Sequence, residues 1–105
     1  MAWIALTFAG VLEIVWAYFM KQSDGFTRLG PTIVTLIAMI ASFALLSLSM
    51  RTLPLGTAYT VWTGIGAVGS FMIGIAILGE PVTTARVIAA LLIVSGMVLM
   101  KLASA

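Results

Sequence analysis

Four long apolar segments, separated by short stretches that contain polar residues, proline or glycine, form the pattern of this sequence. The segments cover about residues 3–21, 30–50, 56–79 and 84–101. Each is close to the roughly 20 residues with which a helix crosses a hydrocarbon core about 30 Å thick. We therefore predict an all-α membrane protein in which residues 1–105 form a single domain of four transmembrane helices.

The composition agrees with this prediction and excludes several classes of protein. Hydrophobic residues make up 63% of the chain and charged residues 8%, which is far from the balance of a soluble domain. The net charge of +2 comes from single basic residues at segment ends, a pattern typical of membrane anchors and not of a nucleic-acid surface. The chain has no cysteine and no histidine, which excludes disulfides, thiolate metal sites and histidine proton shuttles. We expect no metal, no cofactor, no nucleic-acid partner and no enzymatic activity.

The basic residues give almost no signal for the orientation of the chain in the membrane. If the four helices alternate in direction, one side carries two of these residues and the other carries three, namely Arg51 and Lys101 against Lys21, Arg28 and Arg86. The positive-inside rule depends on a bias between the two sides. A single orientation set by weak signals is one interpretation. We favour insertion in both orientations, which gives an antiparallel, dual-topology homodimer with inverted halves like those of alternating-access transporters.

Glu13 is the most informative residue, because it lies near the middle of the first apolar segment. An ionisable side chain at the membrane midplane costs roughly 2.5–3.5 kcal/mol on insertion scales, and it usually marks a pathway for an ion, a proton or a substrate. Gly10 shares the helical face of Glu13, and Trp16 flanks that face. Gly10 either leaves space beside the carboxylate or only permits close packing of a neighbouring helix.

The second and third segments carry polar and aromatic side chains that could complete a site around Glu13. Ser42 lies near the middle of its segment, and the third segment places three further residues, Tyr59, Trp62 and Thr63, on one face. A hydroxyl group can position a carboxylate, and aromatic rings offer their faces to a cation. Two alternatives stay open, because Ser42 could only join neighbouring helices and Tyr59 could be an interfacial belt residue.

Small residues indicate where helices bend or meet. Gly64 and Gly66 are hinge candidates in the third segment, although they could equally be contact points for a close neighbour. Ala89 and Gly96 lie along one side of the fourth segment, which carries no charge between Arg86 and Lys101. Small residues permit close helix–helix approach in membranes, so we predict a dimer contact at Ala89 and Gly96.

These residues resemble the small multidrug resistance family from Met1 to about Ser104. The resemblance depends on Glu13, on the loop 21–31 (Lys-Gln-Ser-Asp-Gly-Phe-Thr-Arg-Leu-Gly-Pro), and on the stretch 56–66 (Gly-Thr-Ala-Tyr-Thr-Val-Trp-Thr-Gly-Ile-Gly). Within the family, the run from Glu13 to Ala17, Glu-Ile-Val-Trp-Ala, is similar to the guanidinium exporter subtype, as are Thr63 and Lys101. Quaternary-ammonium multidrug members usually have a small residue where Trp16 stands.

The resemblance implies a proton-coupled antiporter that exports guanidinium and small substituted guanidinium cations across a bacterial cytoplasmic (inner) membrane. It implies an antiparallel homodimer in which substrate and protons compete for Glu13, and in which four residues surround the carboxylate, namely Trp16, Ser42, Tyr59 and Trp62. Gly10 matches the position packed beside the carboxylate. The alternatives are a multidrug proton antiporter for quaternary ammonium ions and a subunit of a heteromeric pair.

Overall fold

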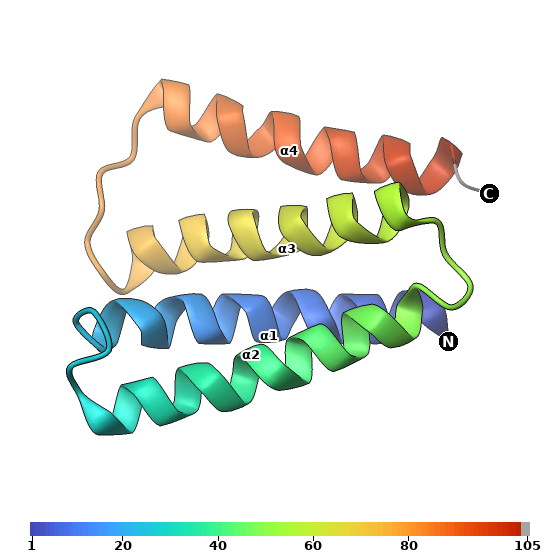
Figure 1. The fold of residues 1–105 in the computed structure, drawn as a ribbon. Coiled ribbons are helices and arrows are strands. Elements are labelled where there is room, and N and C mark those ends of the chain that lie inside the picture. The colour runs from blue at the N-terminus through green and yellow to red at the C-terminus, as the bar shows by residue number, and fades with distance from the viewer. Residues whose placement is uncertain (104–105) are drawn as a thin grey trace.

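The computed structural model describes residues 1–103, and these residues form four helices (Figure 1). The helices are α1 (Ala2–Gln22), α2 (Leu29–Ser49), α3 (Leu55–Ala76) and α4 (Thr84–Ala103). All four are long and apolar enough to cross a membrane. The predicted class, an all-α integral membrane protein with four spans, is therefore confirmed.

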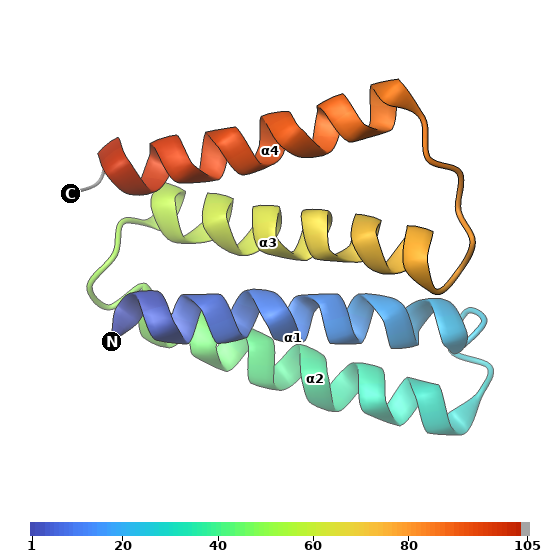
Figure 2. The ribbon, with the colours of Figure 1, turned by 180° about the vertical axis from the view of Figure 1, so that it is seen from behind.

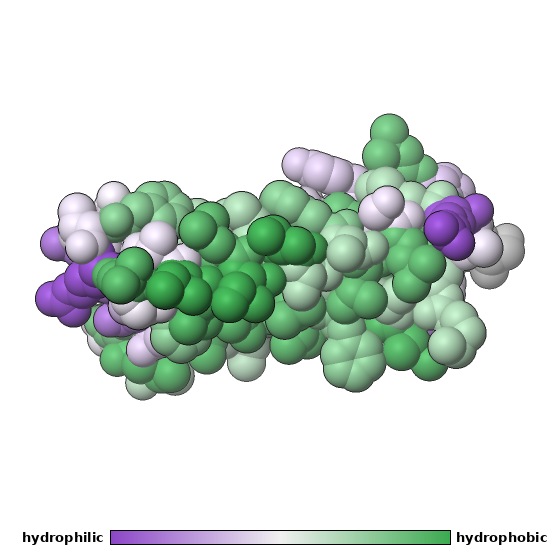
Figure 3. All heavy atoms as spheres, turned by 60° about the horizontal axis from the view of Figure 1, so that its bottom comes forward, coloured by the Kyte–Doolittle hydropathy of each residue, from purple (hydrophilic) through white to green (hydrophobic). Residues whose placement is uncertain are grey.

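The helices lie side by side in a thin layer that measures 42 × 34 × 16 Å. α1 packs against both α2 and α3, and α4 packs against α3 (Figures 1 and 2). The N-terminus, the end of α4 and the connection 50–54 lie at one end of the layer, and the connections 23–28 and 77–83 lie at the other (Figure 2). On the face shown in Figure 3, hydrophilic side chains gather toward the two ends, and the surface between them is mostly hydrophobic. This distribution matches the two aqueous faces and the apolar core of a bilayer.

The core lies where the first three helices meet. It contains six buried residues, namely Leu6, Ala9, Leu46, Ala58, Val61 and Trp62. Ala9 and Ala58 are fully buried, and their small side chains let the helix backbones approach one another. α4 has no buried residue from Thr84 to Ala103, but its partly buried Met100 packs against this core.

The third helix is shorter than its apolar segment. The sequence predicts a helix that continues to residue 79, but α3 ends at Ala76, so this boundary is wrong. Gly79 adopts a positive φ of 68°, and the backbone N–H of Glu80 donates a hydrogen bond to the Gly74 carbonyl over 3.0 Å. Glycine adopts this left-handed conformation without steric cost, so the chain turns away while its residues are still apolar.

Candidate functional site

The Glu13 carboxyl group lies against the backbone of α3 at Gly66. A Cβ atom added at Gly66 would collide with Glu13 Oε1, so the side chain of Glu13 occupies the space that any other residue at position 66 would need. One residue further along α1, the side chain of Ile14 fills the space beside Gly69 in the same way. The absence of a side chain at Gly66 therefore determines how closely the carboxylate approaches α3.

Other small residues are also points of contact. The side chain of Ile65 packs onto Gly10, and that of Met97 packs onto Gly64. α3 is helical without interruption from Leu55 to Ala76, through both Gly64 and Gly66. The geometry thus supports close packing at Gly10, and a hinge at Gly64 or Gly66 stays a prediction.

The Glu13 side chain is half-buried, and its carboxylate has no partner within the described residues 1–103. Among residues 1–103, no group donates a hydrogen bond to its carboxylate and no cation pairs with it; the ion pair in this part of the chain joins Glu80 to Arg86. A carboxylate removed from water without a partner is unfavourable. The site is therefore suited to take up either a proton or a cationic ligand.

Ser42 links three helices one turn away from Glu13. Its buried hydroxyl group donates a hydrogen bond to the Ala9 carbonyl over 2.6 Å, and it accepts one from Trp62 Nε1 over 2.9 Å. A hydroxyl group has a single proton, and in this structure the proton of Ser42 is directed to Ala9. Ser42 thus fixes Trp62 and joins α2 to α1 and α3, and a direct contact with the carboxylate stays a prediction.

A row of four aromatic rings runs from α1 through α2 to α3. Successive ring centroids are 6.4 Å apart from Trp16 to Phe43, 5.7 Å from Phe43 to Trp62, and 5.5 Å from Trp62 to Tyr59. Trp62 is only 7% exposed, and Tyr59 is 53% exposed. Phe43 is not predicted from the sequence pattern, although its position next to Ser42 is a signal for it. These rings supply π faces on which a cation can be held.

The indole N–H of Trp16 also lacks a partner. Its Nε1 atom is inaccessible to solvent and makes no hydrogen bond within residues 1–103. Buried tryptophan N–H groups usually find an acceptor, so an unpaired one needs a physical reason. A ligand or a second protein chain would have to supply the missing acceptor.

The remaining predicted residues lie on or beside α4. Thr63 is exposed and lines a cleft of about 480 Å³ between α3 and α4, together with Tyr59 and Gly96. A Cβ atom at Gly96 would meet nothing within 4 Å, and Ala89 is exposed. The structure therefore separates Thr63, Ala89 and Gly96 from Glu13. Most of the surface of α4 that faces away from α3 is exposed.

Four helices long and apolar enough to cross a membrane, with a carboxylate in the apolar part of the first helix, are the elements of a small membrane transporter. The chain belongs to the small multidrug resistance family, since the family described as "Small Multidrug Resistance protein" matches residues 1–104. A protein of Citrobacter freundii named "Guanidinium exporter" is 56% identical over 104 residues, or 99% of each chain. A protein of Yersinia pseudotuberculosis with the same name is 55% identical over 99% of this chain and 100% of its own. A third, from Salmonella typhimurium, is 53% identical over 99% of both chains.

Proposed function

We propose that this protein exports guanidinium and small substituted guanidinium cations in exchange for protons, and that substrate and protons compete for Glu13. The observation that carries the proposal is the half-buried carboxylate with no partner among residues 1–103. The relatives named "Guanidinium exporter", which match 99% of this chain, support the choice of substrate. Export leaves the covalent bonds of the substrate unchanged, so the protein acts as a transporter and not as an enzyme.

The chemistry of the site fits a small planar cation. Guanidinium presents N–H donors in a fork that matches the two oxygens of a carboxylate. The rings of Trp16 and Trp62 offer π faces beside such a cation. A proton neutralises the same carboxylate, so only one of the two ligands is held at a time. Exchange follows if the protein reorients when substrate or protons are bound, and does not reorient when the two Glu13 carboxylates of a dimer are both empty and charged. A difference of one pH unit across the membrane supplies about 1.4 kcal/mol per proton.

The working unit in this proposal is an antiparallel homodimer in a bacterial inner membrane. The bare surface of α4, which has no buried residue, supports association with a second copy. The weak charge bias, two basic residues against three, supports insertion in both orientations. Two inverted copies would bring both Glu13 carboxylates to one cavity that can open to either side of the membrane.

Transport by the purified protein in liposomes tests this function. With an outward proton gradient, we expect rapid uptake of guanidinium and much slower uptake of tetraethylammonium. Faster uptake of tetraethylammonium would identify a multidrug antiporter instead. If neither cation moves until a second family member is added, the chain is a subunit of a heteromeric pair.

Trp16 should determine which cations are accepted. Trp16→Gly removes one ring of the aromatic row and should lower the ratio of guanidinium to tetraethylammonium transport about tenfold, because a small ligand gains little from a wide cavity. Both rates are measured on one reconstituted sample, so that a loss of folded protein affects them equally. An unchanged ratio would mean that Trp16 contributes only packing.

The orientation of the chain should respond to very few charges. Inserting two lysines into the connection between α2 and α3, which already contains Arg51, should place that connection in the cytoplasm in most molecules. Transport in cells should then fall at least fivefold and recover when a copy with the opposite bias is co-expressed. Full activity of the biased chain alone would contradict the antiparallel dimer.

A further inference from the structure

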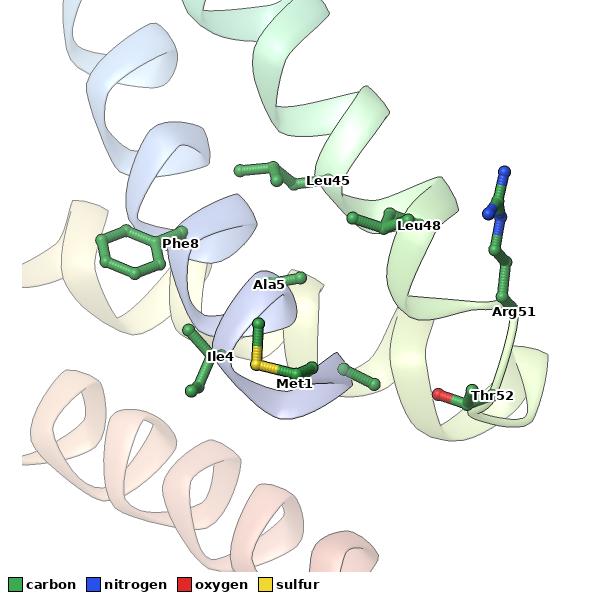
Figure 4. Close-up of a pocket in the computed structure, with 9 residues that line it drawn as sticks. Met1, Ile4, Ala5, Phe8, Leu45, Leu48, Arg51 and Thr52 are labelled. Atoms are coloured by element: carbon green, nitrogen blue, oxygen red, sulfur yellow. The ribbon is translucent and has the colours of Figure 1, made fainter.

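A groove of about 420 Å³ lies at the end of the molecule that carries the connection 50–54, and we propose that it binds an anionic phospholipid (Figure 4). Its walls come from the first turns of α1, from the last turns of α2 and from the residues that follow α2. Six residues define its chemistry: Ile4, Phe8, Leu45, Leu48, Arg51 and Thr52. The groove is a feature separate from the proposed transport site.

The groove faces away from Glu13. Ile4 precedes Glu13 by nine residues, which is about two and a half turns at 3.6 residues per turn, so the two side chains lie on opposite faces of α1. Phe8 lines the groove on the same side of α1 as Ile4 (Figure 4). A second copy that closes over Glu13 would therefore leave this groove in contact with lipid.

The walls of the groove suit a hydrocarbon chain. Figure 4 places Ile4 and Phe8 on α1, and Leu45 and Leu48 on α2. Ile4, Phe8 and Leu48 keep about half of their surface accessible, so the groove is open along its apolar length. An acyl chain that lies between α1 and α2 would cover these side chains by dispersion contacts.

The end of the groove suits an anionic headgroup. Arg51 is exposed directly beyond the last turn of α2, and it has no ion-pair partner among residues 1–103 (Figure 4). Lys101 lies at the same end of the molecule, whereas the described acidic residues of the connections, Asp24 and Glu80, lie at the opposite end. A guanidinium group binds a phosphate through two parallel hydrogen bonds, and Thr52 adds a hydroxyl donor. Because this end carries basic side chains and no acidic side chain among residues 1–103, it favours a lipid that carries net negative charge.

Native mass spectrometry of the purified protein tests the proposal with two lipids of equal chain length, phosphatidylglycerol and phosphatidylcholine. We expect the wild type to retain phosphatidylglycerol roughly fivefold more than phosphatidylcholine, as expected for one cation at a membrane surface. Arg51→Gln should remove this preference. Arg28→Gln is the matched control, since Arg28 is an exposed arginine at the other end of α2, and it should keep the preference. Equal retention of both lipids by the wild type, or an equal loss in both variants, would overturn the proposal.

A second pair of variants tests the apolar part of the groove independently of charge. Leu48 and Leu36 are 49% and 47% exposed on α2, but only Leu48 lines the groove. Leu48→Trp should fill the groove and lower the retention of both lipids at least threefold, while Leu36→Trp should not. The same spectra report the oligomeric state. If Leu48→Trp converts dimers into monomers without a change in lipid per chain, a second copy of the protein occupies the groove and the proposal fails.

Discussion

Glu13→Gln should abolish proton-driven guanidinium transport, with a loss of at least 100-fold, while the protein still inserts and folds. The amide has nearly the shape of the carboxylate, but it can neither carry the negative charge that holds a cation nor exchange a proton. It also removes an unpaired charge from the membrane interior, so the folded yield should not fall. Radiolabelled guanidinium uptake into liposomes, normalised to the amount of folded protein, measures the effect.

Glu80→Gln is the control for this experiment. Glu80 lies in the connection between α3 and α4 and pairs with Arg86 over 3.2 Å, so its loss removes a carboxylate that the proposed transport step does not use. We expect transport by this variant to stay within about twofold of the wild type, because exposed ion pairs contribute little to stability. Uptake by Glu13→Gln at near the wild-type rate would remove Glu13 from the mechanism.

Gly66→Ala should reduce guanidinium transport at least tenfold without unfolding the protein. The new Cβ atom would occupy the position of Glu13 Oε1, so the carboxylate would have to move away from α3. The displaced group is the flexible end of a side chain, and alanine is favoured over glycine within a helix by roughly 0.5–1 kcal/mol. We therefore expect a normal melting temperature together with a large loss of transport.

Gly56→Ala separates this effect from a general effect of alanine in α3. A Cβ atom at Gly56 would meet nothing within 4 Å, so this variant should transport guanidinium at the wild-type rate. Equal rates for Gly66→Ala and Gly56→Ala would show that transport does not depend on the position that the carboxylate occupies here. If only Gly66→Ala has a lower melting temperature, its loss of transport comes from disturbed helix packing and not from displacement of the carboxylate.

The sequence predicted the helices well because the membrane imposes a length of about 20 apolar residues on each span. The polar or proline-containing stretches then marked three connections. The end of α3 was the exception: residues 77–79 are apolar up to Gly79, but the backbone turns back before the hydrophobic pattern stops. Hydropathy reports what a bilayer tolerates, whereas the hydrogen bond from Glu80 to Gly74 depends on local backbone geometry.

The contacts within the site were harder to predict than its members. Glu13 could be found because a carboxylate is rare within an apolar span. Its contact with Gly66 depends on the rotation and register of α1 against α3, which periodicity within one helix does not contain. The same is true of Ser42, whose partners Ala9 and Trp62 lie on two other helices.

Proton release on substrate binding tests most directly the claim that guanidinium and protons share Glu13. Guanidinium is added to the purified protein in weakly buffered solution with a pH indicator, and the released protons are counted at several pH values. Competition for one group predicts that binding releases protons, that affinity rises with pH until the carboxylate is ionised, and that Glu13→Gln releases none. Binding of guanidinium with an affinity that does not depend on pH and without proton release would contradict the shared site.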